Sequence, residues 1–211
     1  MIPKRLFIFH DGPKPLPEIA ANSIEIAGFD LNYDADVYSS LELPQFPQLD
    51  YLIETGNWSC LSDIARHYLV HQFGGVYMDT DCQIMNDFTY LLENDWFCTF
   101  EPPYYANCAF SGGAKGNKIS EALLNEIMAF DFKGYKGRIP LSAWVGPHLQ
   151  TRVLQKLGIR ITPGNYLTIH GAVTILPLHL GFGLTYQQYH AGIRAWPETA
   201  LIRHHWAKSW G

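Results

Sequence analysis

The sequence has no excess of basic charge, no CxxC motif and no long apolar run. Its 15 Lys and Arg stand against 20 Asp and Glu, for a formal net charge of -5, so we expect no surface for a nucleic acid backbone. Because the sequence has no CxxC motif, we expect the 4 Cys to be buried thiols rather than a disulfide framework. Without a membrane-spanning stretch or a signal peptide, we expect a cytoplasmic protein, with peripheral contact at the inner membrane face left open.

The chain of 211 residues is 47% hydrophobic and 17% charged, which is typical of a globular protein. Short apolar runs alternate with segments of helical periodicity, which predicts an α/β fold in one domain spanning 1–211. Strands are expected at 6–9, 30–37, 76–78 and 96–100. Helices are expected at 15–27, from Ser59 or Ser62 to Phe73, at 119–130 and at 148–157.

The most informative segment is 73–81. Gly74 and Gly75 end a helix, a short strand follows, and Asp79 and Asp81 come directly after it. In an extended chain, residues two apart project to one side, so these carboxylates could share one Mn²⁺ or Mg²⁺ ion. Such ions readily accept phosphate oxygens, so the segment predicts a site that handles a diphosphate; the alternative is a solvated loop.

The helix before this segment carries Asp63 and Arg66, which lie three residues apart and share a face. A carboxylate and a guanidinium together could orient sugar hydroxyls. The alternative is a surface ion pair of little energetic value. His67 and His71 lie one turn apart, but no further ligand follows at a zinc-site spacing, so we expect them to be packed or exposed.

The C-terminal segment is rich in polar and aromatic side chains. His204 and His205 could complete a divalent-metal shell, and Lys208, Ser209 and Trp210 could donate hydrogen bonds to phosphate oxygens. An ordinary packed strand is the alternative here.

Taken together, these segments resemble a known family. Residues 62–81 resemble the sugar-binding region of DXD-containing glycosyltransferases, most closely glycosyltransferase family 32. That group includes bacterial capsular polysaccharide enzymes and the yeast initiating mannosyltransferases, and the clostridial glucosylating toxins share its core. Residues 2–4, 12–17, 146–147 and 204–210 resemble the same family, so the likeness spans nearly the whole chain.

The resemblance implies a GT-A fold, a Rossmann-like mixed sheet flanked by helices that binds a nucleotide sugar. It implies a UDP- or GDP-hexose donor, an acceptor that is a glycan or a lipid-linked sugar, and a role in polysaccharide biosynthesis such as that of a capsule. Retention at the anomeric carbon is implied as well. No carboxylate is an obvious covalent nucleophile, so front-face attack by the acceptor hydroxyl is the preferred hypothesis.

The resemblance also implies roles for individual residues. Asp79 and Asp81 would hold Mn²⁺ or Mg²⁺ against the donor diphosphate, and Asp63 and Arg66 would bind the donor sugar. Tyr77 would line the same pocket. A C-terminal lid would close over the pyrophosphate, formed by His205 or His204 with Lys208, Ser209 and Trp210.

One position departs from the family pattern. Where the family has a Trp that stacks on the nucleobase, in the loop after the first strand, this sequence has His10. Imidazole stacks more weakly than indole, and Tyr33 is a candidate substitute. The acceptor is expected to face a loop at 101–118, which contains Tyr104, Tyr105 and Asn107.

Two other classes of function compete with this hypothesis. Phosphotransferases of the haloacid-dehalogenase type also place Asp-x-Asp after a strand, but they usually have Thr or Val where this chain has Gln83. A carbohydrate-binding protein without turnover would use the aromatic side chains, but would leave a metal–diphosphate site without a purpose.

Overall fold

The computed structural model describes residues 1–46, 48–138, 140–161, 168–170 and 173–207. Its central sheet has seven strands in the order β2-β1-β3-β6-β5-β8-β7, and a separate small sheet pairs β4 with β9. The strands are β1 (Arg5–Phe9), β2 (Asp34–Tyr38), β3 (Gly75–Met78), β4 (Cys82–Ile84), β5 (Trp96–Glu101), β6 (Tyr105–Gly113), β7 (Thr168–His170), β8 (Val173–Leu176) and β9 (Ile202–His204). The helices are α1 (Glu18–Glu25), α2 (Leu49–Glu54), α3 (Trp58–Phe73), α4 (Lys118–Met128), α5 (Leu141–Val145), α6 (Pro147–Lys156) and α7 (Tyr186–His190).

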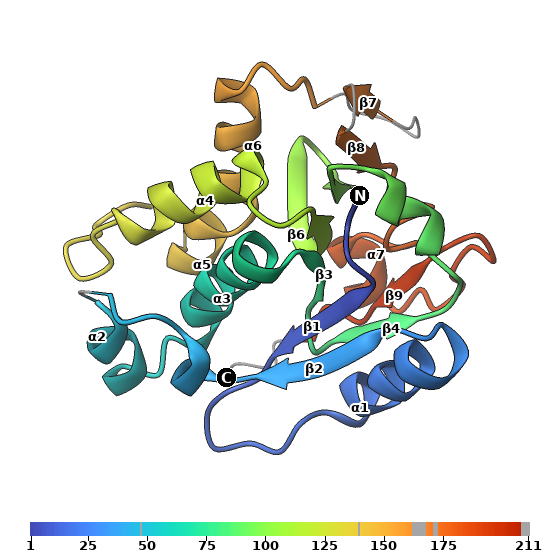
Figure 1. Ribbon diagram of the computed structural model, residues 1–211, viewed down its shortest axis with the longest axis horizontal. Coiled ribbons are helices and arrows are strands. Elements are labelled where there is room, and N and C mark those ends of the chain that lie inside the picture. The colour runs from blue at the N-terminus through green and yellow to red at the C-terminus, as the bar shows by residue number, and fades with distance from the viewer. Residues whose placement is uncertain (47, 139, 162–167, 171–172, 208–211) are drawn as a thin grey trace.

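The first strand is buried on both faces of the sheet. Phe7 and Phe9 pack into a core formed with α3, α4 and α6, whereas Leu6 and Ile8 pack into a second core with α1 and the small sheet. Figure 1 shows these two layers on opposite sides of the sheet. A strand covered on both faces needs an unbroken apolar run, which explains the sequence of β1 and confirms the predicted strand.

The strand directions bring the ends of three strands together. β1 runs parallel to β2 and β3, and β5 runs parallel to β8. β6 lies between β3 and β5 and is antiparallel to both. The carboxyl end of β5 therefore lies beside the start of β6 and that of β3 reaches Phe110 near its middle, on the side of the sheet where ligands bind in open α/β folds.

Helix α3 ends at the predicted position but begins earlier than expected. Asn57 occupies the N-cap position, and Ser59 and Ser62 lie within the helix. The prediction that a serine caps the helix is therefore wrong; the Ser62 hydroxyl instead donates to the Ser59 carbonyl. At the other end Gly74 adopts a φ of +68°, and a Cβ there would lie 2.6 Å from the backbone nitrogen of Lys115, so only glycine fits.

Three other expectations are corrected. Strand β2 begins at Asp34 rather than residue 30, because Ile26–Asp30 continues α1 as a turn of π-helix. The short helix α2 was not predicted. The expected loop at 101–118 is largely a strand, because Tyr105–Gly113 forms β6, a buried central strand; that this segment faces the acceptor stays a prediction.

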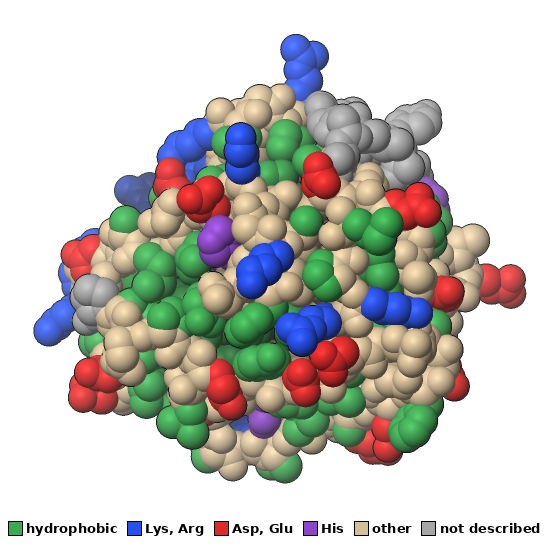
Figure 2. All heavy atoms as spheres, in the orientation of Figure 1, with side chains coloured by type: hydrophobic (Ala, Val, Ile, Leu, Met, Phe, Trp, Pro, Cys, Tyr) green, Lys and Arg blue, Asp and Glu red, His purple; other side chains and the backbone are tan. Residues whose placement is uncertain are grey.

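None of the helices within the described ranges is long and apolar enough to cross a membrane. On the face shown in Figure 2, acidic and basic side chains are interspersed.

Candidate active site

A pocket of about 360 Å³ opens where β3, β5 and β6 meet. Helix α3 forms one wall, β5 and β6 form a second, and the C-terminal segment forms a third. The lining residues are Ser59, Ser62, Asp63, Arg66, Asp79, Glu101, Asn107, Cys108, Ala109, Pro147, Tyr186, His204 and Trp206. The pocket thus joins polar side chains from distant parts of the sequence.

Arg66 lies between two carboxylates. Its guanidinium is 3.2 Å from Asp63 and 3.1 Å from Asp79. It also donates to the backbone carbonyl and the hydroxyl of Ser62 and lies over the ring of Tyr77. Asp63 and Arg66 are buried, with 4% and 5% of their surface exposed. The alternative of a surface ion pair is therefore wrong.

Burial sets the charges of this cluster. It raises the pKa of Asp63 to about 7, although Arg66 acts in the opposite direction. Burial also works against the Arg66 cation, but the neighbouring acids, chiefly Asp79, outweigh it and hold its pKa well above its ordinary value. Arg66 is thus a fixed positive charge in the pocket wall, beside a carboxyl group that titrates near neutrality.

Asp79 and Asp81 lie in a turn between β3 and β4, not in an extended strand. The backbone N–H of Cys82 donates to the carbonyl of Asp79 at 3.0 Å, which closes the turn. The expectation that both carboxylates project from one side of an extended chain is therefore wrong. The Asp79 carboxylate reaches Arg66, whereas that of Asp81 reaches His204.

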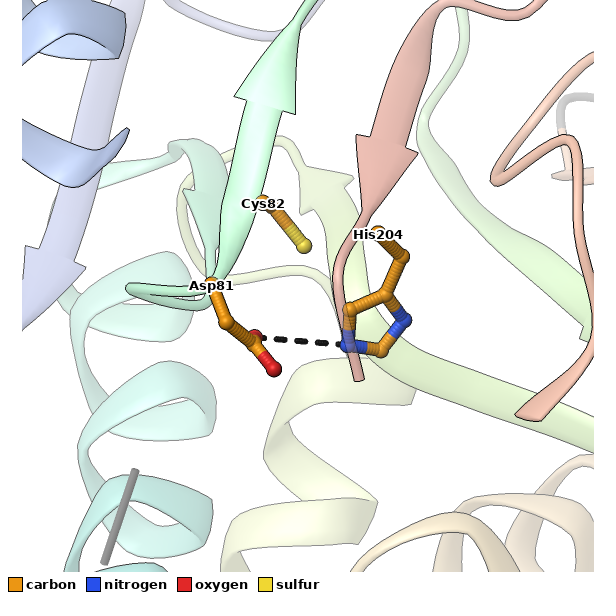
Figure 3. Close-up of side chains that lie close together, drawn as sticks. All are labelled: Asp81, Cys82 and His204. Atoms are coloured by element: carbon orange, nitrogen blue, oxygen red, sulfur yellow. Dashed lines mark ion pairs between the residues drawn. The ribbon is translucent and has the colours of Figure 1, made fainter. Parts of the chain in front are cut away.

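Asp81, Cys82 and His204 form a cluster whose potential ligand atoms all lie within 4.8 Å of one another (Figure 3). His204 Nε2 is 3.3 Å from the Asp81 carboxylate. The thiol of Cys82 instead donates to the Ala109 carbonyl at 3.9 Å and belongs to the core. Asp81 thus offers an oxygen, the type of donor that Mn²⁺ and Mg²⁺ prefer, and His204 offers an imidazole nitrogen, which suits a transition metal better than Mg²⁺.

The surroundings of Asp81 and His204 favour the charged form of each group. Burial disfavours the charged form of both groups, but each partner stabilises the charge of the other. As a result the pKa of Asp81 is lowered and the pKa of His204 is raised. The adjacent His205 lies instead near Gln83 and Trp196. Of the two histidines considered from the sequence, His204 is the one whose imidazole contacts a carboxylate of the aspartate pair.

The remaining predicted donor-binding residues lie elsewhere. Tyr77 is fully buried beneath Arg66 and is absent from the pocket lining. The ring of His10 contacts the Lys14 carbonyl at 2.8 Å and does not line the pocket either. Tyr33 packs on Phe88 in the other core, so the suggestion that it replaces the stacking Trp is wrong. Lys208, Ser209 and Trp210 lie outside the described residues.

The sequence did not single out several residues of the pocket. Glu101 follows an apolar strand directly, the same pattern that drew attention to Asp79, and could have been found by that signal. Trp206 lies against the His204 ring, with centroids 3.8 Å apart, and donates its indole N–H to the Leu184 carbonyl at 3.1 Å. Nothing in the sequence around Tyr186 indicates a role in the pocket.

The sequence matches no protein-family model and no curated protein. The fold, however, is shared with solved glycosyltransferases. The PaToxG glycosyltransferase superimposes with a TM-score of 0.57 at 16% identity, over 74% of this chain and 70% of that one. A glycosyltransferase involved in the glycosylation of the major capsid of PBCV-1 superimposes with a TM-score of 0.52 at 13% identity, over 99% of this chain and 95% of that one. These likenesses establish a GT-A-like fold, as the sequence predicted.

Proposed function

We propose that this chain is a metal-dependent glycosyltransferase of the family 32 type. It would transfer a hexose, with retention, from a nucleotide-diphosphate sugar to a hydroxyl group of a glycan or glycolipid. The observation that carries the proposal is the meeting of the buried Asp63–Arg66–Asp79 cluster with His204 and its partner Asp81 at one pocket. The glycosyltransferase identity of the structural neighbours supports it.

Asp81 and His204 would hold the divalent ion, with Asp79 on the same turn. Two observations support this assignment: the oxygen and nitrogen donors, from the aspartate turn and from β9, are both buried, and His204 lines the pocket. When bound, the ion would neutralise charge on the leaving diphosphate.

Arg66 and Asp63 would bind the donor sugar. Arg66 is a buried cation fixed by its two carboxylates and by Ser62, so it needs no reorganisation when charge develops beside it. Asp63 offers a carboxyl group to a sugar hydroxyl from the same wall. For the transfer step we favour front-face attack by the acceptor hydroxyl, which a glycosyl–Asp or glycosyl–Glu adduct detected by mass spectrometry would refute.

Calorimetry with UDP and GDP tests the proposal directly, in Mn²⁺ and again in EDTA. We expect one of the two nucleotides to bind in Mn²⁺ and to lose most of its affinity in EDTA. Hydrolysis of the corresponding nucleotide sugars would then identify the hexose. If neither nucleotide binds under either condition, the proposal is wrong.

The same samples address the two competing classes of function. Release of phosphate from phosphomonoesters, without nucleotide binding, would indicate a phosphotransferase. Binding of glycans without any nucleotide affinity would indicate a carbohydrate-binding protein. The shared glycosyltransferase fold favours neither alternative.

A further inference from the structure

The pocket wall formed by β5 and β6 carries a rigid pair of polar side chains. Glu101 Oε2 accepts a hydrogen bond of 2.7 Å from the Asn107 side-chain amide. The Asn107 side-chain oxygen in turn accepts from the backbone N–H of Ala109, also at 2.7 Å. The carbonyl of Asn107 accepts from the side chain of Gln150 in α6. Both members of the pair are thus held in place before any ligand arrives.

Glu101 keeps one carboxyl oxygen for a ligand. Within the described part of the chain only its Oε2 has a hydrogen-bond partner, and the residue lines the pocket. Glu101 and Asn107 take no part in the ion pairs of Arg66, which belong to the opposite wall. A fixed carboxyl oxygen with an amide beside it is suited to a sugar hydroxyl.

A row of aromatic rings continues outward from this wall. Tyr105, at the start of β6, lies with its ring 4.4 Å from His148, which follows the pocket residue Pro147. The His148 ring is 6.3 Å from Trp144, and the Trp144 ring is 6.2 Å from Tyr135. Each of these four side chains is partly exposed.

The chemistry of the row favours saccharide rings over other occupants. Aromatic rings with one apolar face and a polar edge match the two kinds of surface on a sugar, its C–H face and its hydroxyl edge. The Arg152 guanidinium lies over one face of the Trp144 ring, 4.0 Å from its centroid, and brings hydrogen-bond donors to the row at that point. A series of neighbouring rings that begins beside the pocket residue Pro147 also fits a chain of repeating ring units.

We propose that the acceptor is a hexose-terminated oligosaccharide. Its terminal hydroxyl would bind Glu101 and Asn107, and its preceding sugars would lie on the aromatic row formed by Tyr105, His148, Trp144 and Tyr135. This inference rests on the proposed function, which assigns the wall of Asp63 and Arg66 to the donor sugar.

Saturation-transfer NMR with a panel of disaccharides tests the inference. The panel would contain maltose, cellobiose, lactose, gentiobiose and mannobiose, and the protein would be saturated with the nucleotide that binds and with diamagnetic Mg²⁺. We expect at least one disaccharide to receive saturation, with strongest transfer to its ring C–H protons. Glu101→Gln and Tyr105→Leu should each weaken that binding by roughly tenfold, as loss of a central contact does.

The control variant is Tyr90→Ala, which removes another exposed tyrosine on a 3-10 helix that contributes nothing to the pocket. It should bind the disaccharide as the wild type does. The inference is wrong if the wild-type protein transfers saturation to none of the disaccharides. It is also wrong if Glu101→Gln and Tyr105→Leu both bind the disaccharide as the wild type does. Glu101→Gln keeps the size and shape of the side chain, so we do not expect a change in disaccharide binding by this variant to come from a disturbed fold.

Nucleotide calorimetry separates this inference from the proposed function. If Glu101→Gln and Tyr105→Leu weaken nucleotide binding as strongly as disaccharide binding, their wall belongs to the donor and the acceptor assignment is wrong. If the wild type binds a nucleotide but no disaccharide, only the acceptor assignment fails. If it binds disaccharides but neither nucleotide, the proposed function itself fails and the acceptor assignment falls with it.

Discussion

His204 Nε2 lies 3.3 Å from the Asp81 carboxylate because β9, which carries His204, pairs with β4, which directly follows Asp81. In the small sheet Cys82 of β4 is opposite His204 of β9, so the register places the imidazole beside the preceding aspartate. Consecutive side chains of a strand point to opposite faces, which explains why His205 points elsewhere. The C-terminal strand therefore builds the candidate metal site together with the aspartate turn.

Asp81→Asn should abolish metal-dependent nucleotide binding, because it removes a ligand charge while keeping the side-chain volume. We expect the affinity for UDP or GDP in Mn²⁺ to fall by at least about tenfold, with little change in far-UV circular dichroism. The control is Asp36→Asn on the exposed edge strand β2, which should bind as the wild type does. Unchanged binding in Asp81→Asn, measured by calorimetry, would remove Asp81 from the metal site.

Arg66→Ala should destabilise the fold strongly, because it leaves the carboxylates of Asp63 and Asp79 without their buried cation. Removal of one partner of a buried ion pair typically costs about 3–5 kcal/mol. Arg5→Ala removes an ion pair with Asp34 whose side chains are 42% and 60% exposed, and should cost at most about 1 kcal/mol. Equal losses for the two variants in urea denaturation would show that the Arg66 cluster is not a buried ionic network.

The sequence predicted those parts of the fold whose signals are local. The apolar run of β1, the helical spacing of α3 and the glycines at 74–75 each specify one element, and each lies where it was expected. Strand β6 was missed because its 105–113 segment includes Gly112 and Gly113, which read as a loop. Those glycines are required by contacts across the sheet, which only the folded structure reveals.

The candidate site was predicted in part for the same reason. Asp63, Arg66, Asp79 and Asp81 follow from short motifs; the first three line the pocket, and Asp81 contacts the pocket residue His204. The choice between His204 and His205 depends on the register of β9, which no local pattern encodes. Glu101 lines the pocket because β5 runs parallel to β3, so that the carboxyl ends of both strands lie on the same side of the sheet. The order and direction of the strands determine this, and no local sequence pattern encodes them.

Gly112→Ala should destabilise the central sheet. A Cβ at Gly112 would lie 2.5 Å from the ring of Phe97 and 3.0 Å from the carbonyl of Gly75, and such overpacking costs about 1–3 kcal/mol. Gly28→Ala is the matched control: a Cβ there meets nothing within 4 Å, in the helical segment Ile26–Asp30. That variant should be neutral or gain up to about 1 kcal/mol. Urea denaturation would contradict the packing argument if the two variants were equally stable.

His67 should make the fold less stable as the pH falls below 7. Burial, and then the nearby Arg66 cation, lowers the pKa of His67 to about 3. Between that value and its ordinary pKa of about 6.5, the unfolded chain binds a proton that the folded chain does not. Stability is therefore lost on acidification, by roughly 2 kcal/mol between pH 7 and pH 5 from this group alone.

Two variants without a titrating group test this dependence. His67→Leu and His67→Gln should both be less sensitive to pH than the wild type over this interval, whatever their absolute stabilities. The measurement is the free energy of unfolding by urea at pH 5, 6 and 7 for all three proteins. If the wild type and both variants lose stability in parallel, His67 is protonated equally in the folded and unfolded chains, and it is not the buried neutral imidazole that its environment in α3 indicates.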